Sequence, residues 1–162
     1  MRTAFILLLM LFSNLLFSQN SFARQLNDII SDTTNHFQKF KGSAQEFKIP
    51  DSASYNSTII LEGTIENWIH IDRTTCMYNA DIINSLKKNE GKKILAEWKL
   101  KLTTALGSEY KIQQNKTRMM NSRIVDGWYF DHGNLTISLY LFQSIWDKSL
   151  YGVSLYIANT HL

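Results

Sequence analysis

Apolar and polar residues alternate most regularly in the C-terminal part of the chain, between Arg123 and Asn159. A period of two places successive side chains on opposite faces of a β-strand. With the preceding segment RIVDGWYFDHG, the pattern predicts three strands joined by two tight turns. The alternating apolar positions are Leu135, Ile137, Leu139 and Leu141 and then Tyr151, Val153, Leu155 and Ile157.

Two other segments have the spacing of helices with one apolar side. We expect the first over 21–41 and the second over 86–106, because Gly42 and Gly107 are suited to end them. Gly91 lies inside the second segment and costs about 1 kcal/mol relative to Ala. The apolar positions are Phe22, Leu26, Ile29, Ile30, Phe37 and Phe40 in the first segment, and Ile94, Leu95, Trp98, Leu102, Ala105 and Leu106 in the second.

The region between the helices alternates again. Residues 57–72 predict one long strand bent at Gly63, and residues 73–82 predict a return strand. A helix beginning near Asn79 is the competing interpretation of the second segment. Residues 43–56 are polar and contain Pro50, which indicates a surface connection, and residues 110–113 allow a short further strand.

The predicted order of elements is α-β-β-α-β-β-β, which indicates the α+β class. We expect a single antiparallel sheet of about five strands with both helices packed on one face. The chain has 162 residues, 44% of them hydrophobic and 19% charged, which is typical of one globular domain. Cys76 is the only cysteine, so the core has no intramolecular disulfide.

The N-terminus has the features of a secretory leader. Arg2 precedes the apolar run AFILLLMLFSNLLF, which has the length of a signal-peptide core and is short for a membrane span. We expect a signal peptide over 1–19 and one exported domain over 20–162, with cleavage after Ser18 or Gln19, or alternatively after Ala23. An uncleaved anchor helix is the other interpretation. The FSQN ending resembles export signals of Bacteroidota, which implies a bacterial protein that is periplasmic or secreted.

Several aromatic residues fall on the polar side of their predicted strands. They are Trp68, Tyr140, Phe142 and Tyr156, and one member of the Trp128-Tyr129-Phe130 run must join them. Large rings on an open sheet face are typical of a binding or dimerisation surface. The same rings are also expected where neighbouring strands only stabilise each other by cross-strand packing.

Basic residues gather between Lys87 and Arg123, and the net charge of the chain is +3. On the predicted second helix, Lys88, Lys92 and Lys99 lie along one flank. This flank is either a docking surface for an anionic partner or a solvated helix face whose lysine stems cover the edge of the core. The second interpretation is favoured, because charge runs are usually solvated. We expect no nucleic-acid partner, because the chain has no nucleic-acid-binding motif and carries an export signal.

Residues suited to catalysis or metal binding are scattered. They are His36, His70, His132, His161, Asp126, Asp131 and Cys76. No metal-binding spacing, nucleophile motif or phosphate loop occurs, so we expect no metal and no cofactor. The segment Asp131-His132-Gly133-Asn134 is typical of a turn. We expect His36 to be a half-buried helix residue and Cys76 to be a buried residue rather than a nucleophile.

The sequence therefore favours a small, non-catalytic, exported protein that binds another protein or a small ligand through its aromatic sheet face. The weak candidate residues for binding are Trp68, His70, Tyr140, Phe142, Tyr156, Lys88, Lys92 and Lys99. The first alternative is a small hydrolase with a site near His70 and Asp72. The second is an inhibitor-like protein that docks through the basic flank of the second helix.

Overall fold

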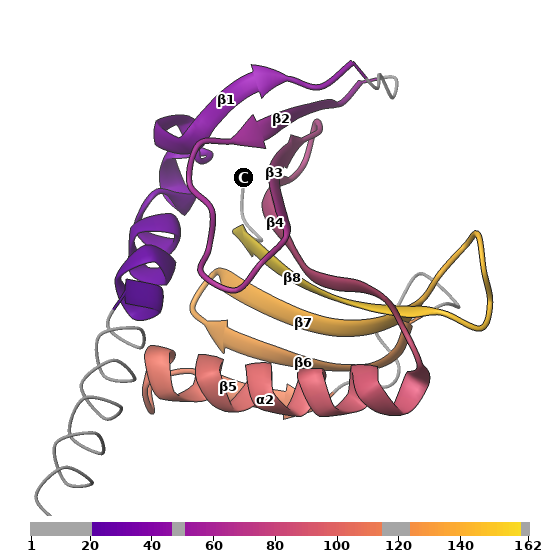
Figure 1. The fold of residues 1–162 in the computed structure, drawn as a ribbon. Helices are drawn as coiled ribbons and strands as arrows, with labels where there is room; N and C mark the ends of the chain where they lie inside the picture. The colour runs from indigo at the N-terminus through magenta and orange to yellow at the C-terminus, as the bar shows by residue number, and fades with distance from the viewer. Residues whose placement is uncertain (1–20, 47–50, 115–123, 160–162) are drawn as a thin grey trace, which may run out of the picture.

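A single antiparallel sheet runs through the whole fold, which belongs to the α+β class as predicted (Figure 1). In the computed structural model, residues 21–46, 51–114 and 124–159 are described. Within them the sheet has eight strands in the order β1-β2-β3-β4-β8-β7-β6-β5. The strands are β1 (Lys41–Ala44), β2 (Ala53–Ser57), β3 (Glu66–Ile71), β4 (Cys76–Leu86), β5 (Lys111–Gln114), β6 (Ile124–His132), β7 (Leu135–Gln143) and β8 (Tyr151–Asn159).

The prediction of about five strands was wrong, and so was the order of elements. β1 and β2 include both ends of the stretch that we expected to be a surface connection, and they pair with each other. β2 reads ASYNS, and because it lies near the sheet margin its side chains are half-buried or exposed and need no apolar alternation. The single strand predicted over 57–72 is divided, since β2 ends at Ser57 and β3 begins at Glu66.

The C-terminal strands follow the predicted pattern, with one difference in their connections. His132 pairs with Leu135 across the β6–β7 hairpin, and Gly133 at φ 58° lies in the tight turn between them. The second connection is not tight: it is a loop over 144–150, closed by a hydrogen bond from Ser144 N to Leu150 O at 2.9 Å.

The second predicted helix is confirmed as α2 (Lys88–Leu106), which packs on β7 and β8. Its Gly91 lies at the point of contact. A Cβ at this position would be 2.5 Å from Cδ1 of Leu141, so the absence of a side chain lets the helix approach the sheet closely.

The first helix is shorter than predicted. An α-helix covers 21–31 within the described residues, followed by 3₁₀ turns at Thr33–Asn35 and Gln38–Phe40. The buried Asp32 follows the last residue of the helix, and its carboxylate accepts a hydrogen bond from Lys39 N at 2.9 Å. His36 and Phe37 adopt positive φ angles there, so His36 is an exposed turn residue and not the half-buried helix residue that we expected.

The helices also do not form the expected layer on one flat sheet face. The sheet is strongly curved, α2 lies along its outer side, and helix 21–31 stands beside the N-terminal strands (Figure 1). The two helices meet through Phe22 and Trp98, whose ring centroids are 5.6 Å apart. Because the sheet is bent, each helix lies against a different part of it and the two touch only at this contact among the ring pairs described.

The hydrophobic core lies between the helices and the outer side of the sheet. Tyr78 is fully buried in it, and its hydroxyl donates to the side-chain oxygen of Asn67, which also accepts from Leu61 N at 3.2 Å. This network ties the loop between β2 and β3 to the core. Other fully buried members are Phe22, Leu26, Ile29, Phe37, Leu61, Ile69, Ala80, Leu102, Phe130, Ile137, Leu139, Leu141, Val153, Leu155 and Ile157.

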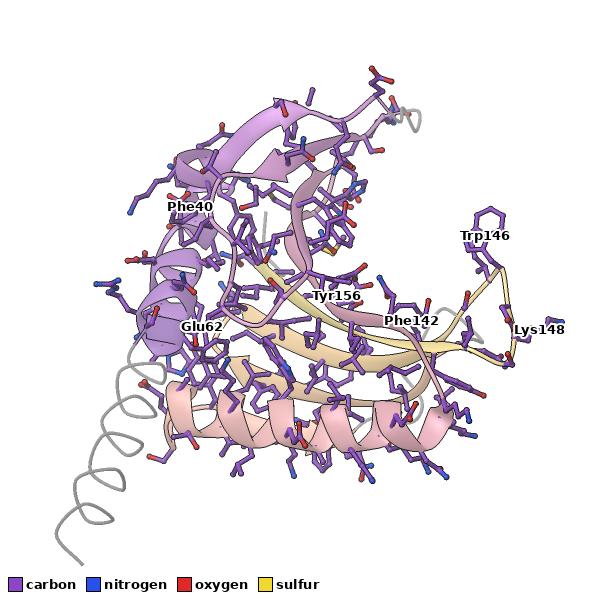
Figure 2. The ribbon with its side chains drawn as sticks, viewed as in Figure 1. Phe40, Glu62, Phe142, Trp146, Lys148 and Tyr156 are labelled. Carbon is purple, nitrogen blue, oxygen red and sulfur yellow. The ribbon has the colours of Figure 1, made fainter. Side chains whose placement is uncertain are left out.

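Because the core covers one side of the sheet, the side chains of opposite parity project from the other side. We call this side the open face. It lies on the hollow side of the curved sheet, where Tyr156 and Phe142 are seen in Figure 2. Among the helices within the described residues, none is both long and apolar enough to span a membrane.

Candidate functional site

Three tyrosine rings form a continuous row on the open face. Tyr140 lies at the centre, with ring centroids 5.6 Å from Tyr129 and 5.5 Å from Tyr156. These residues come from β6, β7 and β8, so strand pairing brings together rings that are distant in the sequence. Of the Trp128-Tyr129-Phe130 run, Tyr129 is therefore the residue that joins the open face.

A cavity of about 480 Å³ lies beside this row. Tyr140, Phe142 and Tyr156 supply its aromatic wall, which is the name we use for these three rings. The other described lining residues are Asp81, Asn84, Ser85, Ile124, Ser144, Ile145 and Trp146. A concave apolar site with a few polar groups has the usual composition of a small-ligand pocket.

Asp81 is the only charged side chain among the described residues that line the cavity. Its carboxylate accepts hydrogen bonds from the Ser154 hydroxyl and from the Asn84 amide, the latter at 3.3 Å. Burial raises the pKa of the Tyr156 phenol, and the negative charge of Asp81 raises it further. Burial likewise raises the pKa of Tyr140. Both phenols are therefore neutral hydrogen-bonding groups at ordinary pH.

Irregular pairing in β4 shapes the floor of the cavity. The register against β8 shifts between Asp81 and Ile83 and again between Ile83 and Leu86, which are positions of β-bulges. Within this segment Ser85 has a φ of 66°, an uncommon value for a residue other than glycine. The bulges direct Asp81, Asn84 and Ser85 toward the same cavity, where uniform alternation would place Asn84 on the opposite face from Asp81.

The loop over 144–150 forms one rim of the cavity and carries an exposed indole. Trp146 is 91% exposed and extends from the loop away from the sheet (Figure 2). The loop is nevertheless held by its own hydrogen bonds, including Trp146 N to Ser144 Oγ at 3.2 Å and Ser149 N to Asp147 Oδ1 at 2.8 Å. The fold therefore presents a large apolar side chain to solvent on an ordered loop.

Trp68 and His70 lie elsewhere on the open face. Trp68 pairs with Asn79, which pairs with Tyr156, so Trp68 is two strands away from the aromatic wall and does not line the cavity. His70 contacts Ser54 through Nδ1, with Oγ at 3.1 Å. The sequence placed both residues on the correct side of the sheet, but they are not part of the cavity.

Asp72 is held in a turn and makes no described contact with His70. Its carboxylate accepts from Thr74 N at 2.8 Å, Thr75 N at 2.7 Å and the Thr75 hydroxyl at 2.7 Å. Bonding to Thr75 and Thr74 holds the pKa of Asp72 well below its usual value of 3.8. These contacts favour a structural role for the carboxylate over acid–base chemistry.

The basic flank of α2 is partly engaged in contacts within the chain. Lys99 Nζ lies 3.5 Å from the centroid of Trp128, and Lys88 Nζ lies 6.0 Å from that of Tyr151. Lys92 is exposed. The nearby Lys101 stacks on Phe22 at 3.9 Å and donates to Glu62 O at 3.1 Å, and burial lowers its pKa. Only part of this flank is therefore available to an anionic partner.

The remaining candidates for metal or catalytic chemistry are dispersed. His132 is exposed, Asp131 accepts from the Thr136 hydroxyl at 2.8 Å, and Asp126 accepts from Gly127 N at 2.9 Å.

Cys76 is buried and donates to His36 O at 3.3 Å, and burial raises its pKa to about 11. His161 lies outside the described residues. Across 21–46, 51–114 and 124–159, no group of three metal-binding side chains occurs.

Comparison with protein-family models, with curated proteins and with solved structures finds no match to this chain.

Sequence reasoning missed Asp81, Asn84 and Trp146. A signal for Asp81 was present, because it alternates with Ala80 and Ile82, which belong to the predicted core face of the return strand. Trp146 had a weaker signal, namely a tryptophan inside a short polar connection. The sequence contained no signal for Asn84, because the orientation of its side chain depends on the bulges in β4.

Proposed function

We propose that the mature protein is a small, exported, non-catalytic binding protein whose ligand occupies the open-face cavity. The observation that carries this proposal is the meeting of the aromatic wall with Asp81 around one cavity of about 480 Å³. Aromatic rings provide contact area at low entropic cost, and a few fixed polar groups orient a ligand. The leader over 1–19 supports a periplasmic or secreted location.

The occupant is a small molecule or a side chain that protrudes from another protein. A catalytic role has less support, because a hydrolase needs ionisable groups within hydrogen-bond reach of each other. His70 and Asp72 have separate partners, and the thiol of Cys76 is buried and protonated at ordinary pH. The inhibitor-like alternative also has less support, because Lys99 is engaged with Trp128.

A thermal-shift screen tests this proposal. The protein exported from a full-length chain is heated with cationic, neutral, anionic and carbohydrate compounds, and each compound that raises the melting temperature is tested again on a Tyr140→Ala/Tyr156→Ala variant. A ligand of the cavity loses its effect there, because binding to the native state is what raises the melting temperature.

Tyr55→Ala is the matched control, because Tyr55 is a half-buried tyrosine of β2 that does not line the cavity. The control retains the ligand effect. The proposal is contradicted if the screen yields no ligand, or if every ligand stabilises the double variant as much as the original protein.

A further inference from the structure

The charge of the cavity restricts what it can hold. Of the described residues that line it, Asp81 alone is charged, and the hydrogen bonds that it accepts come from the neutral groups of Ser154 and Asn84. One ion pair is present among the described residues, between Arg73 and Asp51 at 2.8 Å. No described lysine or arginine pairs with Asp81. A half-buried carboxylate without a cation is an electrostatic cost that a cationic ligand relieves.

The carboxylate retains the capacity to bind such a ligand. An ionised carboxylate has about four acceptor sites, and the described contacts of Asp81 use one on each oxygen. A ligand N–H can therefore bond to Asp81 without displacing Ser154 or Asn84. The two neighbours instead fix the orientation of the carboxylate before the ligand arrives.

The aromatic wall suits the same kind of ligand. Aromatic faces attract cations and also bury apolar stems. The chain already uses this chemistry on its outer side, where Lys99 Nζ lies 3.5 Å from the ring centroid of Trp128. On the open face the rings are present and no described cation of the chain occupies them.

We infer that the cavity receives a cationic organic group, an ammonium or guanidinium on an apolar stem, with Asp81 as its counter-ion and the aromatic wall around the stem. This inference rests on the proposed function and adds the chemical class of the ligand. It concerns a small cation, either free or as the end of a side chain.

Three probes with one aromatic frame and different charges test the inference. They are benzylammonium, benzyl alcohol and benzoate, each titrated calorimetrically into the exported protein. Benzylammonium binds at least about tenfold more tightly than benzyl alcohol, since a charge-assisted hydrogen bond is roughly twice as strong as a neutral one. Benzoate binds more weakly than benzyl alcohol. Equal affinity for the cation and the alcohol, or preference for benzoate, overturns the inference.

Asp81→Asn removes the preference for the cation, so that benzylammonium and benzyl alcohol bind the variant with affinities within about twofold of each other, because the amide retains an acceptor oxygen and carries no charge. Persistence of the preference in this variant overturns the role of Asp81.

Because Asp81→Asn also alters hydrogen bonds near Ser154, a second variant is needed. Asn84→Lys changes an exposed lining residue and places an ammonium in the cavity, so it abolishes binding of benzylammonium and permits binding of benzoate.

The two proposals fail in distinguishable ways. If benzyl alcohol binds and Tyr140→Ala abolishes that binding while no cation is preferred, the cavity is a binding site and the inference about charge is wrong. If none of the three probes binds, the inference about charge is wrong, and the proposed binding function loses the support that this inference gave it.

Discussion

Phe142 on β7 and Gly152 on β8 are direct cross-strand partners, and the ring of Phe142 occupies the space that a side chain at position 152 would need. A Cβ on Gly152 would lie 2.5 Å from Cζ of Phe142 and 2.7 Å from Oδ1 of Asn84. Both of these atoms belong to residues that line the cavity. The absence of a side chain at Gly152 therefore leaves room for Phe142 and Asn84 at the positions where they line the proposed site.

Gly152→Ala is expected to reshape the cavity. The added methyl group displaces the Phe142 ring, and overpacking of this kind typically costs about 1–3 kcal/mol of unfolding free energy. We expect the variant to fold, to unfold at lower denaturant concentration, and to lose binding of the ligands found by the thermal-shift screen. Denaturant titration and calorimetry measure the two effects.

Gly133→Ala is the control for this substitution. A Cβ there meets no other atom within 4 Å, and the cost comes only from a φ of 58° in the β6–β7 turn. It lowers stability by about 1 kcal/mol and leaves ligand affinity unchanged. If both glycine variants retain the ligand with equal affinity, the contact between Phe142 and Gly152 does not shape the site.

The position of Phe22 predicts the mature N-terminus. Phe22 is 1% exposed and packs edge-on against Trp98, and removing a buried phenylalanine typically costs about 3–5 kcal/mol. Cleavage after Ala23 would remove this side chain, so we expect cleavage after Ser18 or Gln19. The intact mass of the protein recovered after expression of the full-length chain measures the cleavage site. A mature chain that begins at Arg24 would contradict the prediction.

Asp72 predicts a loss of stability in acid. Its folded pKa lies well below the ordinary value of 3.8, so its stabilising effect is complete above that pH and disappears as the pH falls below it. The carboxylate is close to solvent, and the effect is at most about 1 kcal/mol after screening. Asp72→Asn therefore reduces the difference in unfolding free energy between pH 6 and pH 2, roughly the interval over which the carboxylate titrates.

Asp51→Asn provides the comparison, because the Asp51–Arg73 ion pair is exposed at both ends and contributes little. Its acid sensitivity remains that of the original protein. If Asp72→Asn and Asp51→Asn behave alike, the turn contacts of Asp72 do not stabilise the fold.

Cys76 is expected to be unreactive in the folded protein. Burial raises its pKa to about 11 from an ordinary value of 9.0, so the folded state holds the neutral thiol. Its contribution to stability is complete below pH 9 and is lost as the pH rises through 11. At pH 8, an aromatic disulfide reagent reacts with Cys76 only when denaturant unfolds the chain. Rapid stoichiometric labelling of the native protein would show that the thiol is accessible.

The elements that the sequence predicted well are those with strict periodicity. α2 and the strands β7 and β8 each bury one side against the same core, and burial imposes the repeat. β1 and β2 lack this apolar repeat because they lie at or next to the sheet margin. The first helix was predicted too long, since Phe37 is buried at helical spacing although its positive φ places it in a turn.

The candidate site was predicted only in part for a related reason. Parity alone placed Tyr140, Phe142 and Tyr156 on one face of the sheet, and the structure brings them together at one cavity. The alternation of side chains along a strand does not predict a bulge. The sequence therefore could not show that Asp81 and Asn84 face the same cavity. Nor does parity show that the connection carrying Trp146 is a long ordered loop.

The central claim is that ligands bind at the open-face cavity, and mapping of backbone amide chemical shifts tests it most directly. The protein, labelled with ¹⁵N, is titrated with benzylammonium or with the best compound from the thermal-shift screen. We expect the perturbed amides to surround the cavity, at Asn84, Ser144 and Tyr156. Perturbations centred on Lys92 and Lys99, or on His70 and Asp72, would contradict the account and favour the basic flank or a catalytic site instead.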